Sequence, residues 1–102
     1  MQKDFFGYNI LMNWVVIEHK DVVNALKKVP VHIRSNYLYW KKLVVNEGLD
    51  KLVGIRGFNF EKLRGDRAGQ YSCRLSRGYR VIFEIRNEEL CVLVLEMNKH
   101  EY

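Results

Sequence analysis

The chain is organised around residues 58–80, which read FNFEKLRGDRAGQYSCRLSRGYR. A basic loop punctuated by glycine comes first, and from about residue 70 apolar and polar residues alternate as in a β-strand. The turn at Ser76-Arg77-Gly78 leads into a second strand that begins at Tyr79. Between Arg56 and Arg80, seven cations against two anions leave a charge of +5, which is the net charge of the whole chain.

Length and composition predict one globular domain. The 102 residues are 48% hydrophobic and 13% aromatic, enough for a single modest core. We expect the domain to span residues 13–102, after an N-terminal arm or extra strand at residues 1–12. No apolar segment approaches the roughly 20 residues needed to cross a membrane, and no secretory signal is recognisable. The chain is therefore predicted to be cytoplasmic, and its clustered cations favour a polyanionic partner such as nucleic acid.

The N-terminal half predicts one strand and two helices. Residues 13–19 are β-branched and aromatic, and their continuous apolar run indicates a strand buried on both faces. Asp21 is a candidate cap for a helix that runs to about Val29. Pro30 ends that helix and suits the first turn of the next, which should end near Gly48.

Two features of this half have both a structural and a functional interpretation. Tyr37 and Trp40 lie on one helical stripe and could stack on bases, but at this spacing core packing is favoured. His19 is interpreted as a polar strand end rather than a catalytic group. Residues 49–55 are expected to form a short helical turn or a loop.

The C-terminal half predicts three strands, at about residues 70–75, 79–85 and 90–97. Short turns join them, so they form an antiparallel meander with the second strand in the middle. Cys73 and Cys91 should then lie about 10 Å apart, beyond disulfide reach, as small buried hydrophobic residues. The expected class is α+β: a strand, a two-helix hairpin and an antiparallel sheet of three to four strands.

The period of two assigns side chains to the faces of this sheet. Tyr79, Val81 and Phe83 share one face, which the helices should cover. Arg74 and Arg80 should stand together on the helix-free face, where two neighbouring guanidinium groups repel unless an anion lies between them. A phosphate fits, because guanidinium binds it through two hydrogen bonds. The alternative is neutralisation by Glu84 or Glu61.

Four segments in this order resemble the RelE/HigB superfamily of bacterial toxins, including its YoeB-like branch. They are Gly57-Phe58 with residues 61–65, then residues 71–75, residues 78–83 and residues 99–102. The resemblance covers about residues 14–102 and implies the RelE-like fold. Members are toxins of type II toxin-antitoxin systems, silenced by a cognate antitoxin. The resemblance implies a ribosome-dependent endoribonuclease that cuts mRNA without a metal or other cofactor.

The resemblance also implies catalytic roles. Glu61 is the candidate base, or else orients Arg80, which would hold the scissile phosphate. His100 is the candidate acid, and Tyr102 resembles a terminal tyrosine that positions a base. The other candidate RNA- or phosphate-binding residues are Lys62, Arg64, Arg67, Arg74, Arg77 and Lys99. Glu101 between His100 and Tyr102 departs from relatives in which the two are adjacent, so acid and base roles stay open.

Two other functions remain open. A gyrase-inhibiting, ParE-like relative would keep the sheet but lack the acid and base set. A member that only binds RNA would show salt-dependent binding without cleavage. His19, His32 and His100 lie far apart and lack the spacing of a metal site, so no metal is expected. The expected partners are the antitoxin, the ribosome and mRNA, with DNA reached only through the antitoxin and no membrane involved.

Overall fold

The computed structural model describes residues 14–99, so the expected arm at residues 1–12 lies outside the described residues, as do His100 and Tyr102. The elements are β1 (Val15–Glu18), α2 (Lys20–Leu26), α3 (Val31–Glu47), α4 (Leu49–Gly54), β2 (Glu61–Lys62), β3 (Tyr71–Ser76), β4 (Tyr79–Arg86) and β5 (Cys91–Lys99). Short 3₁₀ turns cover residues 56–58, 65–67 and 87–89. No helix within residues 14–99 is long and apolar enough to cross a membrane.

The α+β class is confirmed, and within residues 14–99 the sheet has five strands in the order β1-β5-β4-β3-β2. Strands β3, β4 and β5 form the predicted antiparallel meander. The sheet differs from the expectation at its two edges. Strand β1 joins β5 in parallel, because the intervening helices carry the chain back across the sheet, and β2 pairs with β3 where a loop was expected.

The helices follow the sequence signals closely. Helix α2 is capped by His19, whose Nδ1 accepts a hydrogen bond from the Asp21 backbone N–H at 3.0 Å. The predicted cap was Asp21, which instead lies in the first turn. Helix α2 also ends at Leu26, three residues earlier than predicted. Pro30 precedes α3 and Gly48 ends it, both as predicted.

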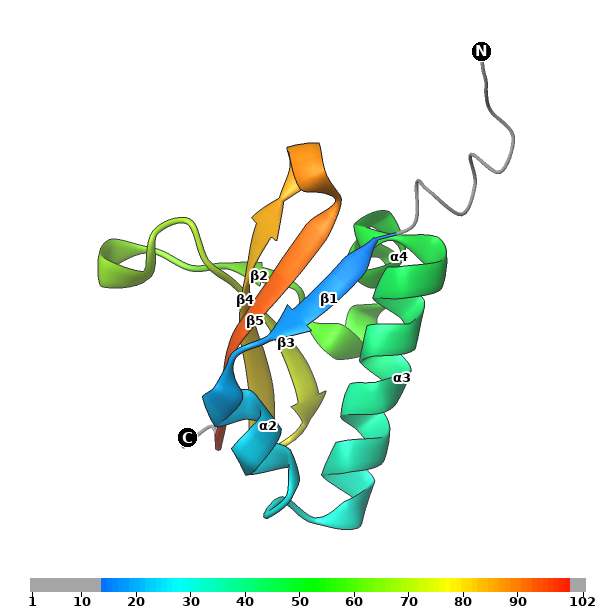
Figure 1. Cartoon of the computed structure of the whole chain (residues 1–102), viewed down its shortest axis with the longest axis vertical. Coiled ribbons are helices and arrows are strands. Elements are labelled where there is room, and N and C mark those ends of the chain that lie inside the picture. The colour runs from blue at the N-terminus through cyan, green and yellow to red at the C-terminus, as the bar shows by residue number, and fades with distance from the viewer. Residues whose placement is uncertain (1–13, 100–102) are drawn as a thin grey trace.

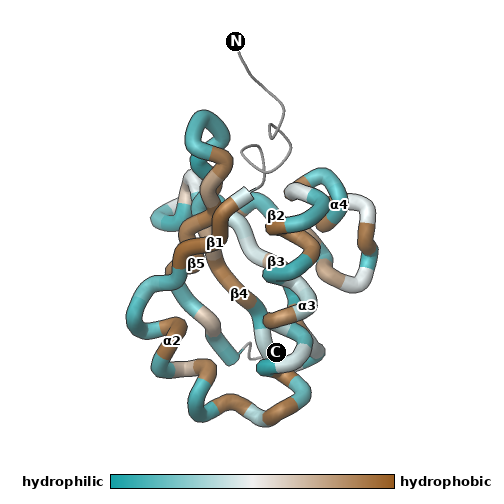
Figure 2. Tube along the Cα trace, turned by 45° about the vertical axis from the view of Figure 1, so that its right-hand side comes forward, coloured by the Kyte–Doolittle hydropathy of each residue, from teal (hydrophilic) through white to brown (hydrophobic). Residues whose placement is uncertain are grey.

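The core lies between the helices and one face of the sheet (Figure 1), where the central strands are largely apolar (Figure 2). Tyr37 and Trp40 of α3 are fully buried, which confirms their interpretation as core residues. The ring centroids of Trp40 and Phe83 lie 5.2 Å apart. Val81 and Phe83 face the helices and are also fully buried, so the face predicted for β4 is confirmed.

Within residues 14–99, the other face of the sheet carries no helix. On β1, Val16 and Glu18 alternate toward α3, where Glu18 accepts hydrogen bonds from Tyr37 and Lys41. Burial, with the bond to Glu18, raises the pKa of Tyr37. Val15 and Ile17, which point the other way, are 53% and 51% exposed. The prediction that this strand is buried on both faces was therefore wrong.

A β-bulge in β5 changes which of its side chains face the core. Val81 pairs with Met97 and Ile82 with Glu96, but Phe83 pairs with Val94, so Leu95 is the additional residue. Val94 before the bulge and Met97 after it are both buried against the helix side. Glu96 and Asn98 therefore point to the helix-free face.

The two cysteines are free and buried, as predicted. Cys73 pairs with Val81, whereas Cys91 pairs with Arg86, at the far end of β4 and on the opposite face of the sheet. Their separation thus exceeds the predicted two strand spacings. Burial raises the pKa of the Cys73 thiol to about 12. Both side chains act as small apolar groups rather than nucleophiles.

The joint between α3 and α4 generates a stability prediction. Gly48 has φ 83° and ψ 175°, a conformation that is essentially restricted to glycine, and an added Cβ would lie 3.3 Å from Trp14 Nε1. We expect Gly48→Ala to lower the free energy of unfolding by about 1–3 kcal/mol, measured by urea denaturation. The matched control is Gly54→Ala, since nothing lies within 4 Å of its added Cβ at the end of α4. Equal effects of the two substitutions would contradict this account.

Candidate functional site

The helix-free face of the sheet carries two facing arginines. Arg74 of β3 pairs directly with Arg80 of β4, and Arg80 pairs with Asn98 of β5. Directly opposed residues of antiparallel strands share a face. The predicted juxtaposition of Arg74 and Arg80 is therefore confirmed, and we call Arg74, Arg80 and Asn98 the arginine row.

A second row lies beside it on the same face. Glu61 pairs with Ser72, Ser72 with Ile82, and Ile82 with Glu96. Glu61 is exposed on the short strand β2, and within residues 14–99 it takes part in no ion pair and no side-chain hydrogen bond. Its carboxylate is thus free of competing contacts there, and β3 separates it from Arg80.

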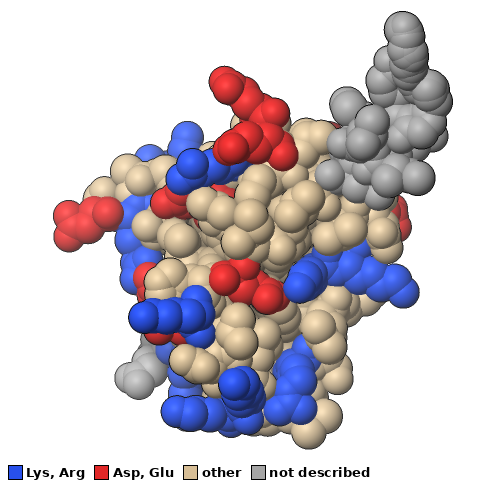
Figure 3. Space-filling view, viewed as in Figure 1, with Lys and Arg blue, Asp and Glu red and all other residues tan. Residues whose placement is uncertain are grey.

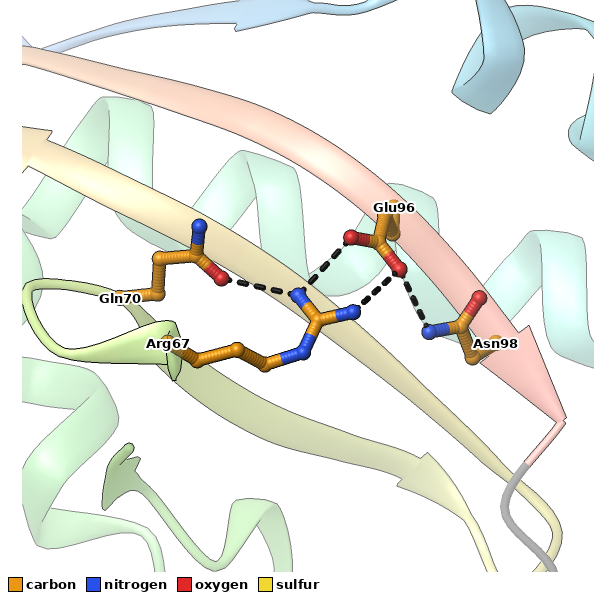
Figure 4. Close-up of polar contacts among 4 residues, drawn as sticks. All are labelled: Arg67, Gln70, Glu96 and Asn98. Carbon is orange, nitrogen blue, oxygen red and sulfur yellow. Dashed lines mark hydrogen bonds and ion pairs between the residues drawn. The ribbon is translucent and has the colours of Figure 1, made fainter. Parts of the chain in front are cut away.

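Arg67 reaches this face from the loop between β2 and β3 (Figure 4). Its Nη1 donates to Glu96 Oε2 at 2.8 Å, and its Nη2 donates to Glu96 Oε1 at 3.0 Å. Nη1 also donates to Gln70 Oε1 at 2.9 Å, while Asn98 Nδ2 donates to Glu96 Oε1 at 2.8 Å. The guanidinium and the carboxylate thus form a bidentate pair held from both sides.

Glu96 supplies the negative charge that was expected near the arginines of this face. Hydrogen bonds from Arg67 and Asn98, together with the charges of Arg67 and Arg80, hold the pKa of Glu96 below its usual value. Glu96 in turn raises the pKa of Arg67. The sequence had suggested Glu84 or Glu61 for this role. Glu84 instead lies 3.6 Å from Arg86, away from the arginine row.

Arg80 is the most enclosed cation of the row. Its Nε atom is buried and has no hydrogen-bond partner within the part of the chain that the structure describes. A buried donor without an acceptor is unfavourable, so the hydrogen-bonding capacity of Arg80 is incompletely used among the described residues. Arg74, opposite Arg80, is exposed and can reach the same anion.

The remaining predicted residues do not all share this face. Arg64 and Arg77 are exposed in loops, next to β2 and in the β3–β4 turn. Lys62 pairs with Tyr71 and Lys99 with Tyr79, so both share the helix side of the sheet and are exposed at its rim. His100 and Tyr102 lie outside the described residues, and their roles stay predictions.

Glu96, Asn98 and Gln70 are site residues that the sequence analysis missed. The available signal was weak: Glu96 and Asn98 alternate with Met97 and Lys99 after a run of apolar residues. That pattern predicts a polar face for the end of the last strand. It does not reveal that the bulge at Leu95 directs this face toward the arginines.

A hollow of about 490 Å³ adjoins Glu96 and Asn98. Its other walls include His19, Asp21 and the 95–97 segment of β5. His19, predicted to be a polar strand end, thus lies at the border of the candidate site as well as capping α2. Within residues 14–99, no group of three or more His, Cys, Asp or Glu side chains could hold a metal ion.

Charge is distributed unevenly over the surface. On the face shown in Figure 3, acidic side chains gather at the tip of the β4–β5 hairpin, and lysines and arginines are more frequent toward the opposite end. Such an asymmetry orients an approaching polyanion toward the basic end. The arginine row lies at that end of β4, beside the β3–β4 turn.

The sequence matches no family model and no curated protein. Among solved structures it is similar to the archaeal RelE of the RelE-RelB complex from Pyrococcus horikoshii, with 26% identity, a TM-score of 0.68, and coverage of 85% of this chain and 94% of that one. The RelBE2 toxin-antitoxin complex from Mycobacterium tuberculosis has 21% identity, a TM-score of 0.67, and coverage of 86% and 99%. The Staphylococcus aureus YoeB dimer has 17% identity, a TM-score of 0.67, and coverage of 88% and 99%. The fold expected from the sequence resemblance is thus confirmed.

The Arg67–Glu96 pair predicts a specific pH dependence of stability. Because the folded-state pKa of Glu96 is depressed, its ionised form stabilises the fold above the unfolded-state pKa of about 4.3. That contribution is lost as the pH falls through the lower, folded-state pKa. The difference in unfolding free energy between the wild type and Glu96→Gln should therefore be constant above about pH 5 and shrink as the pH falls below the unfolded-state pKa. A difference that is unchanged to pH 2 in urea titrations would contradict this assignment.

Proposed function

From a fold shared with RelE, YoeB and YafQ toxins, we propose that this chain is the toxin of a type II toxin-antitoxin module and an mRNA-cleaving endoribonuclease. The observation that carries the proposal is the opposed pair Arg74 and Arg80 on a face that no helix covers. Two guanidinium groups on neighbouring strands form a site for a phosphodiester. The Nε of Arg80 has no hydrogen-bond partner within the described residues, so a donor of this pair is unused there.

The proposed reaction is an internal transfer at phosphorus. The ribose 2′-oxygen forms a bond to the scissile phosphorus, and the bond from phosphorus to the 5′-oxygen breaks. A base takes the proton of the 2′-OH, and an acid supplies a proton to the departing 5′-oxygen. The products are a 2′,3′-cyclic phosphate and a free 5′-OH. Neither a metal nor a cofactor takes part in this scheme.

Arg80 and Arg74 would stabilise the negative charge that builds up on the phosphate oxygens. Preorganised cations at such a position are worth several kcal/mol, or about 10²–10³ in rate. Glu61 lies on the same face in the adjacent row and is the proposed base. His100 is the proposed acid and Tyr102 the proposed base-stacking residue, by resemblance to the family.

The remaining cations would follow the RNA backbone. Arg67 is already on the helix-free face, while Lys62, Arg64, Arg77 and Lys99 lie in loops and at the rim. In this proposal the substrate is mRNA on the ribosome. A cognate antitoxin would silence the toxin by covering the basic face. On this proposal the protein acts in the cytoplasm.

The test is to map mRNA 5′ ends after adding the purified chain to translating ribosomes, with naked RNA in parallel. Arg80→Ala should reduce cleavage by at least about 10²-fold, because it removes a cation from the charged transition state. The matched control is Arg86→Ala, an exposed arginine on the same face of the same strand, opposite Cys91. It should retain nearly full activity.

The outcomes separate the proposed function from its alternatives. Cleavage that depends on ribosomes and on Arg80 supports the interferase. Equal activity of the two variants would contradict the role of Arg80. RNA binding with unbroken RNA would favour a binding-only protein, and arrested DNA synthesis with intact mRNA would favour a gyrase inhibitor.

A further inference from the structure

The loop between β2 and β3 is fastened across the helix-free face by one ion pair. Arg67 belongs to this loop, and Glu96 belongs to β5, so β3 and β4 lie between their points of attachment in the sheet. To donate to both oxygens of Glu96, the Arg67 side chain must cross β4, as Figure 4 shows. The loop therefore closes over the sheet rather than projecting freely.

The residue beneath this crossing is unusually well covered. Ile82 lies between Ser72 and Glu96 in its row and faces away from the helices, yet it is fully buried. It is absent from the cluster of residues that pack with the helices. Its burial therefore indicates cover from the helix-free side, which is the side that the stem of Arg67 crosses.

The ion pair with Glu96 engages Arg67, a cation that the proposed reaction can use. Arg67 and Glu96 are each 37% exposed at the side chain, so the pair is accessible to solvent and to a competing anion. A carboxylate and a phosphate bind guanidinium with similar bidentate geometry. Glu96 also lies close enough to Arg80 for that charge to contribute to its lowered pKa.

We propose that Glu96 is an internal latch that holds Arg67 closed over the helix-free face and releases it to a backbone phosphate of bound RNA. This inference rests on the proposed function. A single exposed ion pair is weak in water, whereas a phosphate on this face meets Arg80 and Arg74 as well. Exchange of one carboxylate for a phosphate thus adds Arg67 to the RNA contacts. Glu96 is a positioning residue that sets the affinity of the site.

The opposite role makes an opposite prediction. If Glu96 only held Arg67 in the orientation that RNA needs, loss of its charge would weaken RNA binding. If Glu96 competes with phosphate, loss of its charge strengthens binding and adds one phosphate contact. The direction of the change therefore separates the two roles.

The experiment measures binding of a 2′-O-methyl RNA oligonucleotide, which lacks the nucleophilic 2′-OH and cannot be cleaved, across a series of salt concentrations. Glu96→Gln preserves the shape of the side chain and removes its charge. We expect its affinity at low salt to exceed that of the wild type by about three- to tenfold. The slope of log K against log salt should steepen by about 0.7, as for one further phosphate contact with a single strand.

Two controls isolate the Arg67 pair. Glu84→Gln makes the same change of charge on the same face, but beside Arg86, and should alter affinity about twofold or less. In an Arg67→Ala background, Glu96→Gln should raise RNA affinity no more than Glu84→Gln does, because Arg67 is no longer present to be released.

The possible results test the latch and the proposed function separately. Equal effects of Glu96→Gln and Glu84→Gln, weaker binding by Glu96→Gln, or a gain that persists without Arg67 would each overturn the latch. If the wild type binds the oligonucleotide with dependence on Arg80, the proposed function stands even when the latch fails. Absence of binding by the wild type and by Glu96→Gln would overturn the proposed function, and the latch with it.

Discussion

The site depends on the register of the β3–β4 hairpin. A short turn at Arg77-Gly78 pairs Ser76 with Tyr79, and an irregularity between Arg74 and Ser76 then sets Arg74 opposite Arg80. Gly78 N–H donates to the Ser76 hydroxyl at 3.2 Å, which closes the turn. A slip of one residue would turn the side chains of one strand to the opposite face and move its arginine toward the core. The burial of Cys73 and Val81 on the other face makes that slip unfavourable.

The helices cover one face of the sheet, and this explains why the candidate site lies on the other face. Helix α3 and its neighbours bury one face almost completely, and charged groups could enter that face only at a large desolvation cost. On the uncovered face Arg74 is exposed and Arg67 and Arg80 are partly exposed, so solvent and anions can reach this face. Their mutual repulsion is reduced by Glu96, which serves both Arg67 and, at longer range, Arg80. The strands thus hold the charged side chains in fixed positions. Contact with solvent lowers the free-energy cost of exchanging one anion for another.

Local sequence signals predicted most of the elements. The turn at Ser76-Arg77-Gly78 marked the first hairpin, Pro30 and Gly48 bounded α3, and period-two alternation placed Arg74 and Arg80 on one face. The two edge strands were not predicted correctly, because pairing between distant segments leaves no local periodicity. Val15 and Ile17 form an apolar strand that looked buried, but the side chains on its second face are exposed.

The candidate site was predictable only in part for a related reason. The arginine row follows from one hairpin, whereas the Arg67–Glu96 pair needs a loop to cross the sheet and a bulge to turn Glu96 toward it. Neither has a periodic signature in the sequence. The roles of His100 and Tyr102 rest on the resemblance of the C-terminal residues to those of the family.

The additional residue at Leu95 shifts the phase of the last strand. With regular alternation after Val94, Glu96 and Asn98 would point into the helix-side core and Met97 into solvent. Without Leu95, the polar end of this strand would have to be buried. With Leu95, the strand end carries Glu96 to the basic face. Deletion or insertion of a single residue here would interchange the two sets of side chains at once. Length variation at this position is a route by which homologous chains could gain or lose an internal acid without changing a residue in the hairpin.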